Sequence, residues 1–474
     1  MNKSVMIIAL GDIYWTRFAA HFSEKLMKEN IPCVIVLESR AGEYQSFLRR
    51  VEYPNAKVYY LTDFVNKADL RRDAVNCMPI MSDYLRVEML GQKKKLFKTD
   101  WNMVASCISE FTQHVMDNED IGLMIGDQVS TSLSYNFCEA ATKVGAVYWG
   151  LAGSRLSGRH IMSKTIKSED MIVGEIYEEI VSAKKPMTAE EEKWATQYLA
   201  EIDSQVPDYM RSKRLNNVTP GKFIRPRFIK SIIGSLLYAL LESSDNKAIL
   251  IKDKPLNGII TATFRNFSRW SKVSRITKYL IDDVEKELNG SKYYIFPIHY
   301  QPEASTVVAS PRHSDQLNLI KNLSFSMPAG TKLVVKEHVS NIGFPDVEFY
   351  RAVKSYPNVI LASHNCNIKE LIRNSLGVIT ITSTAGFEAL LLNKHVYYFG
   401  DVFYTYHPNA IKLDAWEEAE KILGNSNELH KFDNVAFLVA YKRYTYEGRI
   451  DFERHDFSIT DKLLNRVRVH MRYD

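Results

Sequence analysis

The sequence is poor in cysteine and in long apolar runs. Its 474 residues include five cysteines and no CxxC pair; the cysteines are Cys33, Cys77, Cys107, Cys138 and Cys366. Because zinc sites are usually built from closely spaced cysteine pairs, this spacing predicts no zinc site and fits a reducing compartment. No run reaches the roughly 18 apolar residues that a membrane-spanning helix needs. The first apolar run is short and lacks a small-residue cleavage site, so we expect no signal peptide.

The common motifs for cofactors and metals are also missing. No GxGxxG follows the first predicted strand and no P-loop occurs, so conventional NAD and P-loop ATP sites are not supported. Neither an HxxxH pair nor a DxD with suitable flanks is present, and we expect no metal and no cofactor. The composition, 46% apolar and 25% charged, is that of a soluble globular protein with enough chain for one or two sizeable cores.

Strand-like and helix-like segments alternate in the first and last thirds of the chain. The expected strands are 5–10, 33–38, 58–61, 122–125 and 147–149, then 293–297, 332–336, 359–362, 377–382 and 396–399. The expected helices between them are 16–29, 101–116 and 130–144, then 314–323, 346–355, 368–373 and 386–392. Such alternation predicts an α/β protein with two Rossmann-like, doubly wound domains and a cleft between them.

The region between these thirds has a different composition. We predict a long charged helix over 189–213, a linker interrupted by Pro and Gly over 216–226, and a buried or interfacial helix over 231–241. The predicted domains are 1–180, a helical and basic bridging region 181–290, a second domain 291–410, and helices 411–474 that pack back on both.

Polar or small residues follow the predicted strands of the last third, as His299–Glu303, Lys336–His338, Ser363–Asn365 and Thr382–Gly386. Ligands bind at the carboxyl ends of parallel strands, so these segments predict one site. Ser383–Gly386 would offer phosphate the N–H groups of a helix start, although Ser or Thr there also suits an ordinary N-cap. Lys336 and His338 suit a nucleotide phosphate or its departure as a leaving group; the alternative is a surface loop.

These segments resemble the C-terminal half of bacterial capsule-polysaccharide biosynthesis glycosyltransferases. FPIHYQPEAST, KLVVKEH and NVILASHNCNIKELIRNSLGVITITSTAGFEALLLNKHVYYFG occur in the family's order. The resemblance implies a GT-B fold similar to Kdo transferases, with residues 1–180 as acceptor domain and 291–410 as nucleotide-sugar domain. Relatives often read KEHP and TGTxGxEALLxGKPV. Here Val339 and His395 replace prolines, and Ser383 and Asn393 replace glycines.

The resemblance also implies site residues. Those expected to bind the donor are His299, Gln301, Glu303, Ser305, Thr306, Lys336, Glu337, Ser383, Thr384, Ala385, Gly386 and Glu388, with Glu388 on the donor ribose. We predict His338 and Asp127 as catalytic. Asp127 stands where relatives often have a Gly-Glu pair, and a carboxylate there suits a general base for the acceptor hydroxyl; the alternative is a helix N-cap. Arg155 and Arg159 are candidate substrate contacts, and solvated surface arginines are the alternative.

The net charge of +5 is unevenly distributed. Residues 211–280 contain 15 Lys or Arg and three acidic residues, so this segment carries +12 and the rest of the chain −7. Aromatic and aliphatic residues lie between the cations, a pattern that favours an anionic membrane surface or a polyanionic glycan. A solvated structural face and an RNA-binding patch are the alternatives. We predict a membrane partner, no nucleic acid, and a cytoplasmic protein peripheral to the inner face of the cytoplasmic membrane.

The predicted function is a metal-independent glycosyl transfer. The donor is a nucleotide sugar, a CMP-activated ulosonic acid such as Kdo by resemblance, and it is a substrate and no cofactor. The acceptor is a capsule or lipopolysaccharide glycan, free or lipid-linked. Two alternatives stay open. One is a UDP-sugar transferase, an epimerase or a polyol-phosphate transferase of GT-B fold, and the other is an inactive scaffold in a polysaccharide assembly complex.

Overall fold

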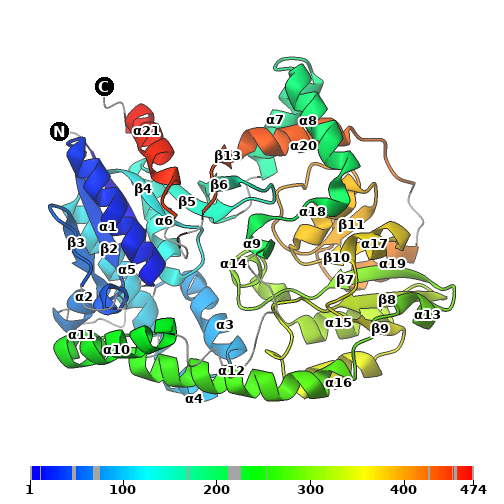
Figure 1. Ribbon diagram of the computed structural model, residues 1–474, viewed down its shortest axis with the longest axis horizontal. Coiled ribbons are helices and arrows are strands. Elements are labelled where there is room, and N and C mark those ends of the chain that lie inside the picture. The colour runs from blue at the N-terminus through cyan, green and yellow to red at the C-terminus, as the bar shows by residue number, and fades with distance from the viewer. Residues whose placement is uncertain are drawn as a thin grey trace.

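Two largely parallel sheets, each covered by helices, form the two halves of the molecule (Figure 1). The computed structural model describes residues 3–10, 12–44, 50–67, 75–167, 170–211, 226–251, 254–424, 428–450, 452 and 456–471. The predicted α/β class with two Rossmann-like, doubly wound GT-B domains is confirmed by the order of the strands.

The first sheet has the strand order β13-β6-β5-β4-β1-β2-β3. Its strands are β1 (Ser4–Ala9), β2 (Cys33–Leu37), β3 (Lys57–Tyr60), β4 (Ile121–Asp127), β5 (Val147–Gly153), β6 (Arg159–Ser163) and β13 (Tyr446–Glu447). β1 to β5 pair in parallel, whereas β6 and β13 add an antiparallel edge. The central strands β1 and β2 are continuous apolar runs, as strands buried on both faces require.

Helices cover both faces of the first sheet. α1 (Ile13–Lys28) and α21 (Ile459–Met471) pack on one face, and α5 (Trp101–Asn118) and α6 (Ser132–Val144) on the other. The shorter helices of this half are η1 (Arg40–Glu43), α2 (Leu61–Lys67), η2 (Met78–Ile80), α3 (Met81–Met89) and α4 (Lys93–Lys98).

The second sheet has the order β12-β11-β10-β7-β8-β9, and all its pairs are parallel. Its strands are β7 (Lys292–Pro297), β8 (Thr331–Lys336), β9 (Val359–Ala362), β10 (Gly377–Thr380), β11 (His395–Tyr398) and β12 (Ala410–Lys412). Its helices are α14 (Ala304–Val307), η5 (Pro311–His313), α15 (Gln316–Phe325), α16 (Val347–Ser355), α17 (Ile368–Asn374), α18 (Thr384–Leu391), α19 (Glu417–Gly424) and α20 (Asn434–Tyr444). This is the Rossmann strand order.

The region between the domains is helical. Its elements are α7 (Asp170–Val181), α8 (Ala189–Ala200), η3 (Ile202–Ser204), α9 (Asp208–Arg211), α10 (Pro226–Leu241), α11 (Ser243–Lys247), α12 (Pro255–Thr277) and α13 (Val284–Leu288). The single helix predicted over 189–213 is wrong, because α8 ends at Ala200 and Pro207 separates η3 from α9; residues 212 and 213 lie outside the described residues. Among the described helices, none has the length and hydropathy to cross a bilayer.

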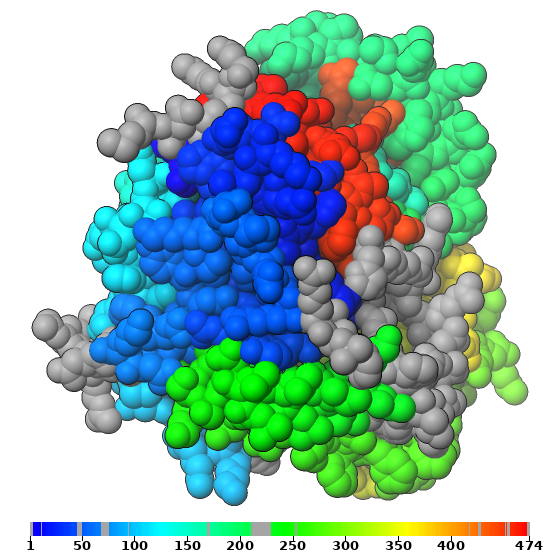
Figure 2. Space-filling model, turned by 60° about the vertical axis from the view of Figure 1, so that its left-hand side comes forward, coloured from blue at the N-terminus to red at the C-terminus, as the bar shows by residue number. Residues whose placement is uncertain are grey.

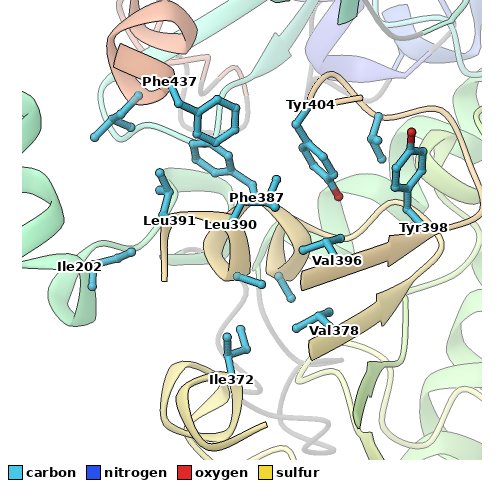
Figure 3. Close-up of a cluster of buried hydrophobic side chains, with 14 of the residues drawn as sticks. Ile202, Ile372, Val378, Phe387, Leu390, Leu391, Val396, Tyr398, Tyr404 and Phe437 are labelled. Atoms are coloured by element: carbon cyan, nitrogen blue, oxygen red, sulfur yellow. The ribbon is translucent and has the colours of Figure 1, made fainter. Parts of the chain in front are cut away.

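The chain passes between the domains earlier than predicted and returns at its end. α7, placed in the first domain by the prediction of 1–180, contributes Val173 and Tyr177 to the core of the second domain. Figure 3 shows this core, where Phe387 of α18 meets Phe437 of α20 and Ile202 approaches from the bridging region. After α20 the chain crosses back, since β13 joins the first sheet and α21 packs beside α1.

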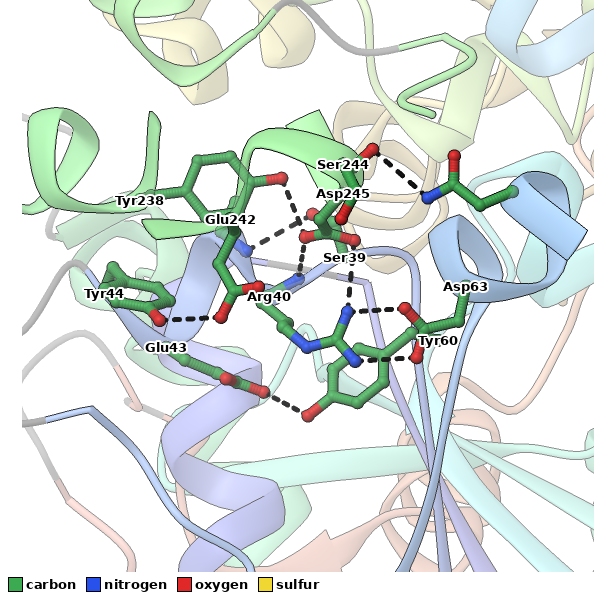
Figure 4. A network of polar contacts seen from close by, with 12 residues as sticks. Ser39, Arg40, Glu43, Tyr44, Tyr60, Asp63, Tyr238, Glu242, Ser244 and Asp245 are labelled. Carbon is green, nitrogen blue, oxygen red and sulfur yellow. Dashed lines mark hydrogen bonds and ion pairs between the residues drawn. The ribbon is translucent and has the colours of Figure 1, made fainter. Parts of the chain in front are cut away.

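The bridging helices are attached to both domains. Figure 4 shows the polar network that holds α10 and α11 on the first domain. The Arg40 guanidinium binds both carboxylate oxygens of Asp63 at 2.7 Å, and the Arg40 backbone N–H donates to the buried Asp245 at 2.9 Å. On the second domain, the Arg269 guanidinium of α12 donates to the backbone carbonyls of Ile342 (2.6 Å) and Ser340 (3.0 Å).

Candidate functional site

Each sheet has a point where the strand order reverses, and candidate residues lie at both points. In the first sheet the reversal falls between β1 and β4, and Asp12 and Asp127 lie at the carboxyl ends of these strands. In the second it falls between β7 and β10, which are followed by the segments of His299 and Ser383. Ligands of open α/β sheets bind at such reversals. β8 pairs with β7 and β9 pairs with β8, all in parallel, so all four predicted segments share one edge.

Asp127 is the candidate base of the first sheet. One carboxylate oxygen accepts a hydrogen bond from the Gln128 backbone N–H at 3.0 Å. Burial raises the pKa of Asp127 to about 7, and the neighbouring Asp12 carboxylate contributes to the rise. The N-cap alternative is wrong, because Thr131 caps α6 and forms a capping box with Ser134. A carboxylate with a pKa near neutrality exchanges protons readily and suits general-base catalysis.

Two neighbours of Asp127 were missed by the sequence analysis. Asp12 caps α1, accepting from the backbone N–H groups of Tyr14 and Trp15. Arg86 lies on α3 and donates to the backbone carbonyl of Ser130 at 2.9 Å, while its positive charge lowers the pKa of Asp127. Asp12 had a detectable signal, since it is a carboxylate only three residues after the end of the first strand. Arg86 had none, because only the tertiary structure brings α3 to this edge.

His299 lies in the interior and joins two strand ends. Its Nε2 accepts a hydrogen bond from the Thr382 backbone N–H at 3.1 Å. Gln316 accepts from its backbone N–H at 2.7 Å and donates to its carbonyl at 3.0 Å. Burial lowers the pKa of His299 to about 3, so the imidazole is neutral. The structure therefore gives His299 a positioning role: it sets the segment after β7 against the segment after β10.

The segment after β8 separates into buried and accessible groups. Glu337 is fully buried, and one of its carboxylate oxygens accepts from the His338 backbone N–H (2.7 Å) and from Asn341 (3.2 Å). The Lys336 ammonium is largely enclosed, and it donates to the carbonyls of Glu337 (3.2 Å) and His364 (3.3 Å). Burial raises the pKa of Glu337 and lowers that of Lys336. Both residues thus shape the loop that carries His338.

His338 is partly exposed and oriented for donation. Its Nδ1 accepts a hydrogen bond from the Ser340 backbone N–H at 3.1 Å, which places the proton of a neutral ring on Nε2. The Tyr300 ring stacks against the imidazole with 6.2 Å between centroids. An Nε2–H group held in this way can donate to a phosphate oxygen.

The start of α18 is both capped and closely packed. The Ser383 hydroxyl accepts from the Ala385 backbone N–H at 3.2 Å, so the N-cap interpretation of Ser383 is confirmed. A Cβ atom at Gly386 would lie 2.2 Å from the Tyr404 hydroxyl oxygen, and this contact explains the glycine. Ala385 is buried, whereas Ser383 and Thr384 are partly exposed. The Gly386 N–H donates to the Ser383 carbonyl at 3.0 Å, so the turn uses its own N–H groups and the start of α18 offers a ligand the positive end of the helix dipole.

Glu388 takes part in a charged cluster between the domains. Its carboxylate lies 3.8 Å from the Lys369 ammonium, and its pKa is raised by burial and lowered by Lys369 and Arg155. Lys369 also donates to the backbone carbonyls of Ile202 and Gln205 in the bridging region, each at 2.5 Å. Contact of Glu388 with the donor ribose stays a prediction.

The remaining donor-site candidates lie around α14. The Gln301 side chain donates to the Ser314 carbonyl at 2.7 Å, and Glu303 occupies the N-cap position of α14. The Ser305 carbonyl accepts from the Thr382 hydroxyl at 2.8 Å. Thr306 is buried and donates to the Glu303 carbonyl, so its hydroxyl serves the loop itself.

The two candidate arginines of the first domain have different environments. The Arg155 backbone N–H donates to the Tyr441 hydroxyl at 3.1 Å, and its guanidinium lies 4.8 Å from the centre of the Phe403 ring, near Glu388. Arg159 donates to the Thr445 hydroxyl (2.6 Å) and carbonyl (2.7 Å), at the end of α20. Arg155 therefore faces the second domain, whereas Arg159 ties the C-terminal segment to β6.

Helix α3 connects the two strand edges. It packs against α14 and η5 of the second domain, and through Arg86 and Asp83 it holds the segment between Asp127 and α6. α3 therefore contacts both the segment that follows Asp127 and the short helices near the donor-site candidates. In the described part of the chain, no three His, Cys, Asp or Glu side chains come together in a way that would hold a metal ion.

A family model described as "Capsule polysaccharide biosynthesis protein" matches residues 262–408. The match confirms the predicted family resemblance. This capsule-synthesis region, residues 262–408, contains α12 from its third turn onward and the second sheet through β11. The capsule polysaccharide modification proteins LipB of Neisseria meningitidis serogroups A and B are 25% identical to the chain over 149 residues. That match covers 28% of this chain and 36% of LipB, so the chain spans about a third of the curated relatives' length.

Solved structures resemble the chain at low sequence identity. The beta Kdo 2,7 transferase of Thermosulfurimonas dismutans KpsC is 14% identical, with 75% of this chain and 89% of that chain covered and a TM-score of 0.38. The Staphylococcus aureus MnaA–UDP co-structure is 11% identical, with 100% and 98% covered and a TM-score of 0.26. Likenesses this distant identify neither a donor nor an acceptor.

Proposed function

We propose that this protein is a glycosyltransferase of capsule or lipopolysaccharide synthesis that transfers a sugar from a nucleotide donor to a glycan hydroxyl. The observation that carries the proposal is the pair of strand-order reversals. One presents Asp127, whose pKa of about 7 suits a base. The other presents the start of α18, with His338 after the neighbouring strand β8, and both suit a phosphate. The match of residues 262–408 to capsule polysaccharide biosynthesis proteins supports the pathway class.

The proposed reaction assigns one task to each edge. Asp127 removes the proton of the acceptor hydroxyl, and the oxygen forms a bond to the anomeric carbon of the donor. The bond between that carbon and the nucleotide phosphate oxygen breaks, and its electron pair leaves with the phosphate. The Nε2–H of His338 and the positive end of the α18 helix dipole stabilise the departing negative charge. In this scheme, donors and a helix dipole do the work that a metal ion does elsewhere.

We further propose a CMP-activated ulosonic acid such as Kdo as donor, on the basis of the sequence resemblance. The test is a comparison of CMP, CDP and UDP by thermal unfolding and by NMR of the labelled protein. CMP is expected to raise the melting temperature most and to shift the most signals. A larger response to UDP would replace this donor by a UDP-sugar, and CDP would point to polyol-phosphate transfer. No response to any of the three would favour the inactive scaffold.

A donor-hydrolysis assay separates an enzyme from a scaffold. Many transferases slowly hydrolyse their donor when the acceptor is left out, because water takes the place of the acceptor hydroxyl. We expect release of CMP from CMP-Kdo by the wild-type chain. Absence of hydrolysis together with absence of transfer to capsule or lipopolysaccharide glycans would contradict the proposed activity.

The acceptor of such an enzyme would be assembled at a membrane. We propose that the protein works in the cytoplasm, peripherally on the inner face of the cytoplasmic membrane, through the basic residues of 211–280. The described cations of this segment include Lys230, Lys247, Lys254, Arg275 and Lys278, all of them exposed, while 212–225 and 252–253 lie outside the described residues.

A further inference from the structure

Helix α12 presents an apolar stripe to solvent. Ile260, Phe264, Phe267 and Trp270 are 52%, 71%, 53% and 45% exposed, and their spacing of three or four residues places them along one side of the helix. The opposite side is occupied, because Arg269 binds the loop after β8 and Ile276 is fully buried. Clustered exposed aromatic residues of this kind mark an interaction surface.

The stripe continues onto neighbouring helices. Phe97 of α4 is 81% exposed, and Leu240 and Leu241 at the end of α10 are 77% and 67% exposed. α10 packs against α12. α4 and α12 lie along the lower rim of the molecule in Figure 1, and Figure 2 shows α10, in green, on the same rim, with the light-blue segment of α4 projecting below it. Three helices thus bring exposed apolar side chains to one rim.

A basic hollow lies between α4 and the first half of α12. Its volume is about 720 Å³, and four lysines line it: Lys94, Lys95 and Lys98 of α4, and Lys254 at the N-cap of α12. Ile260 of the apolar stripe lines the same hollow. None of the described residues that line it is acidic. The hollow therefore concentrates positive charge beside an exposed apolar surface, although three of its lysines lie far outside the basic segment 211–280.

We propose that this rim docks on an anionic phospholipid bilayer, with the lysine hollow on lipid phosphates and the α12 stripe in the interfacial layer. Cations attract the anionic surface, and aromatic side chains are favoured at the depth of the head groups. The rim is thus a specific site for the membrane association proposed above. The docking proposal rests on that association and does not depend on which donor the protein uses. The mixture of lysines and exposed aromatic residues fits a bilayer better than an acidic protein, which would leave the stripe in water.

The docking surface is mechanically connected to the donor site. Arg269, on the protein side of α12, holds the carbonyls of Ser340 and Ile342, two and four residues after His338. A bilayer bound to the outer side of α12 therefore contacts the helix that fixes the His338 loop. The lipid-linked glycan that such an enzyme would extend lies in that same bilayer.

The experiment is flotation of the full chain with vesicles in the absence of nucleotide. Vesicles of phosphatidylcholine alone are compared with vesicles that also contain phosphatidylglycerol. We expect binding to the anionic vesicles only, weakened by salt. The variant Lys94→Gln/Lys98→Gln/Lys254→Gln should bind less, with the partition coefficient falling about fivefold for each lysine removed. Phe264→Ser/Phe267→Ser should reduce the binding that persists at high salt.

The matched control removes three exposed lysines from other parts of the molecule, as Lys28→Gln/Lys193→Gln/Lys286→Gln. It should bind like the wild type, and melting temperatures verify that all variants fold. Equal binding to both vesicle types, no binding to either, or equal loss in the control and the hollow variant would overturn the proposal. A rise in melting temperature with inorganic phosphate, without any binding to vesicles, would also overturn it. Because no nucleotide is present, any of these results leaves the proposed transferase activity standing.

Discussion

The carboxyl edges of the two sheets share a topology and differ in chemistry. The first edge presents the carboxylates Asp12 and Asp127, and the pKa of Asp127 is raised to about 7. The second presents imidazole and hydroxyl groups and the start of α18, with His299 neutral in the interior and His338 partly exposed. One edge is suited to accepting a proton, the other to binding an anion. A two-substrate reaction needs both, and duplicated Rossmann topology supplies two sites that can diverge separately.

Asp127→Asn should have the largest effect on this comparison. Removal of the base should lower the rate of transfer by about 10²- to 10⁴-fold, the usual contribution of general-base catalysis. The measurement is product formation from CMP-Kdo and a glycan acceptor. Asp120→Asn, exposed at the other end of the same strand, is the control and should retain the wild-type rate. Full activity of Asp127→Asn would show that Asp127 is not the base.

Asp127→Asn should lower the activity of the protein without lowering its stability at pH 8. The folded-state pKa of Asp127 is raised from 3.8 to about 7, so the folded state binds the proton more tightly than the unfolded state. Between about pH 4 and about pH 7 the unfolded carboxyl has lost its proton while the folded one still holds it. The stability of the wild type therefore falls as the pH rises through this range. The asparagine variant lacks this loss, and its melting temperature at pH 8 should equal or exceed that of the wild type. A much lower melting temperature would indicate a structural role instead.

Two substitutions of His338 separate its nitrogens. The amide of asparagine can replace Nδ1, which accepts from the Ser340 N–H, but it does not reach the place of the Nε2–H. Glutamine extends further and can replace the Nε2–H donor. We expect His338→Asn to weaken nucleotide binding about tenfold, in keeping with the loss of a hydrogen bond to a charged group, and His338→Gln to weaken it less. Isothermal titration with CMP measures both. If His338→Gln weakened binding more than His338→Asn, the ligand would depend on the Nδ1 side of the ring and the assignment of Nε2 would be wrong.

Arg269→Gln tests whether α12 supports the second edge. The substitution weakens the bonds to the Ser340 and Ile342 carbonyls, and we expect the free energy of unfolding to fall by about 1–3 kcal/mol and CMP affinity to fall a few-fold. Lys272→Gln, one turn away, breaks an ion pair with the exposed Asp346 and should change stability by less than about 1 kcal/mol. If both variants bound CMP like the wild type, the bridging helix would have no part in the donor site.

The smallest expected effect is that of Asp12→Asn on the pH profile. Asparagine is as good an N-cap as aspartate, so α1 should stay intact. The transfer rate of the wild type should rise as the pH passes through about 7, where Asp127 loses its proton. Without the Asp12 charge the pKa of Asp127 falls, and the profile should move to lower pH by a fraction of a unit. A shift to higher pH, or none, would show that the two carboxylates do not interact.

Much of this site could be predicted from local patterns. The apolar runs before Asp127, His299, His338 and Ser383 predicted strands, and parallel strands end at one edge, so the second edge was assembled correctly. Burial could not be predicted in the same way. Glu337 and His338 are adjacent in sequence, yet the first is buried and the second is partly exposed. The choice depends on Asn341 and on the turn of the chain after β8, which no periodicity reveals.

The sequence by itself determined the α/β class, the two domains and the charge asymmetry, because strand and helix periods and net charges are local properties that add along the chain. Only the tertiary structure decided which groups meet. It brought Asp12 beside Asp127, passed α7 and α20 into one core, and returned β13 and α21 to the first sheet. It also placed Lys94 of α4 beside Lys254 of α12. Contacts between residues this distant in the chain arise from packing of whole elements, to which no short segment of sequence is sensitive.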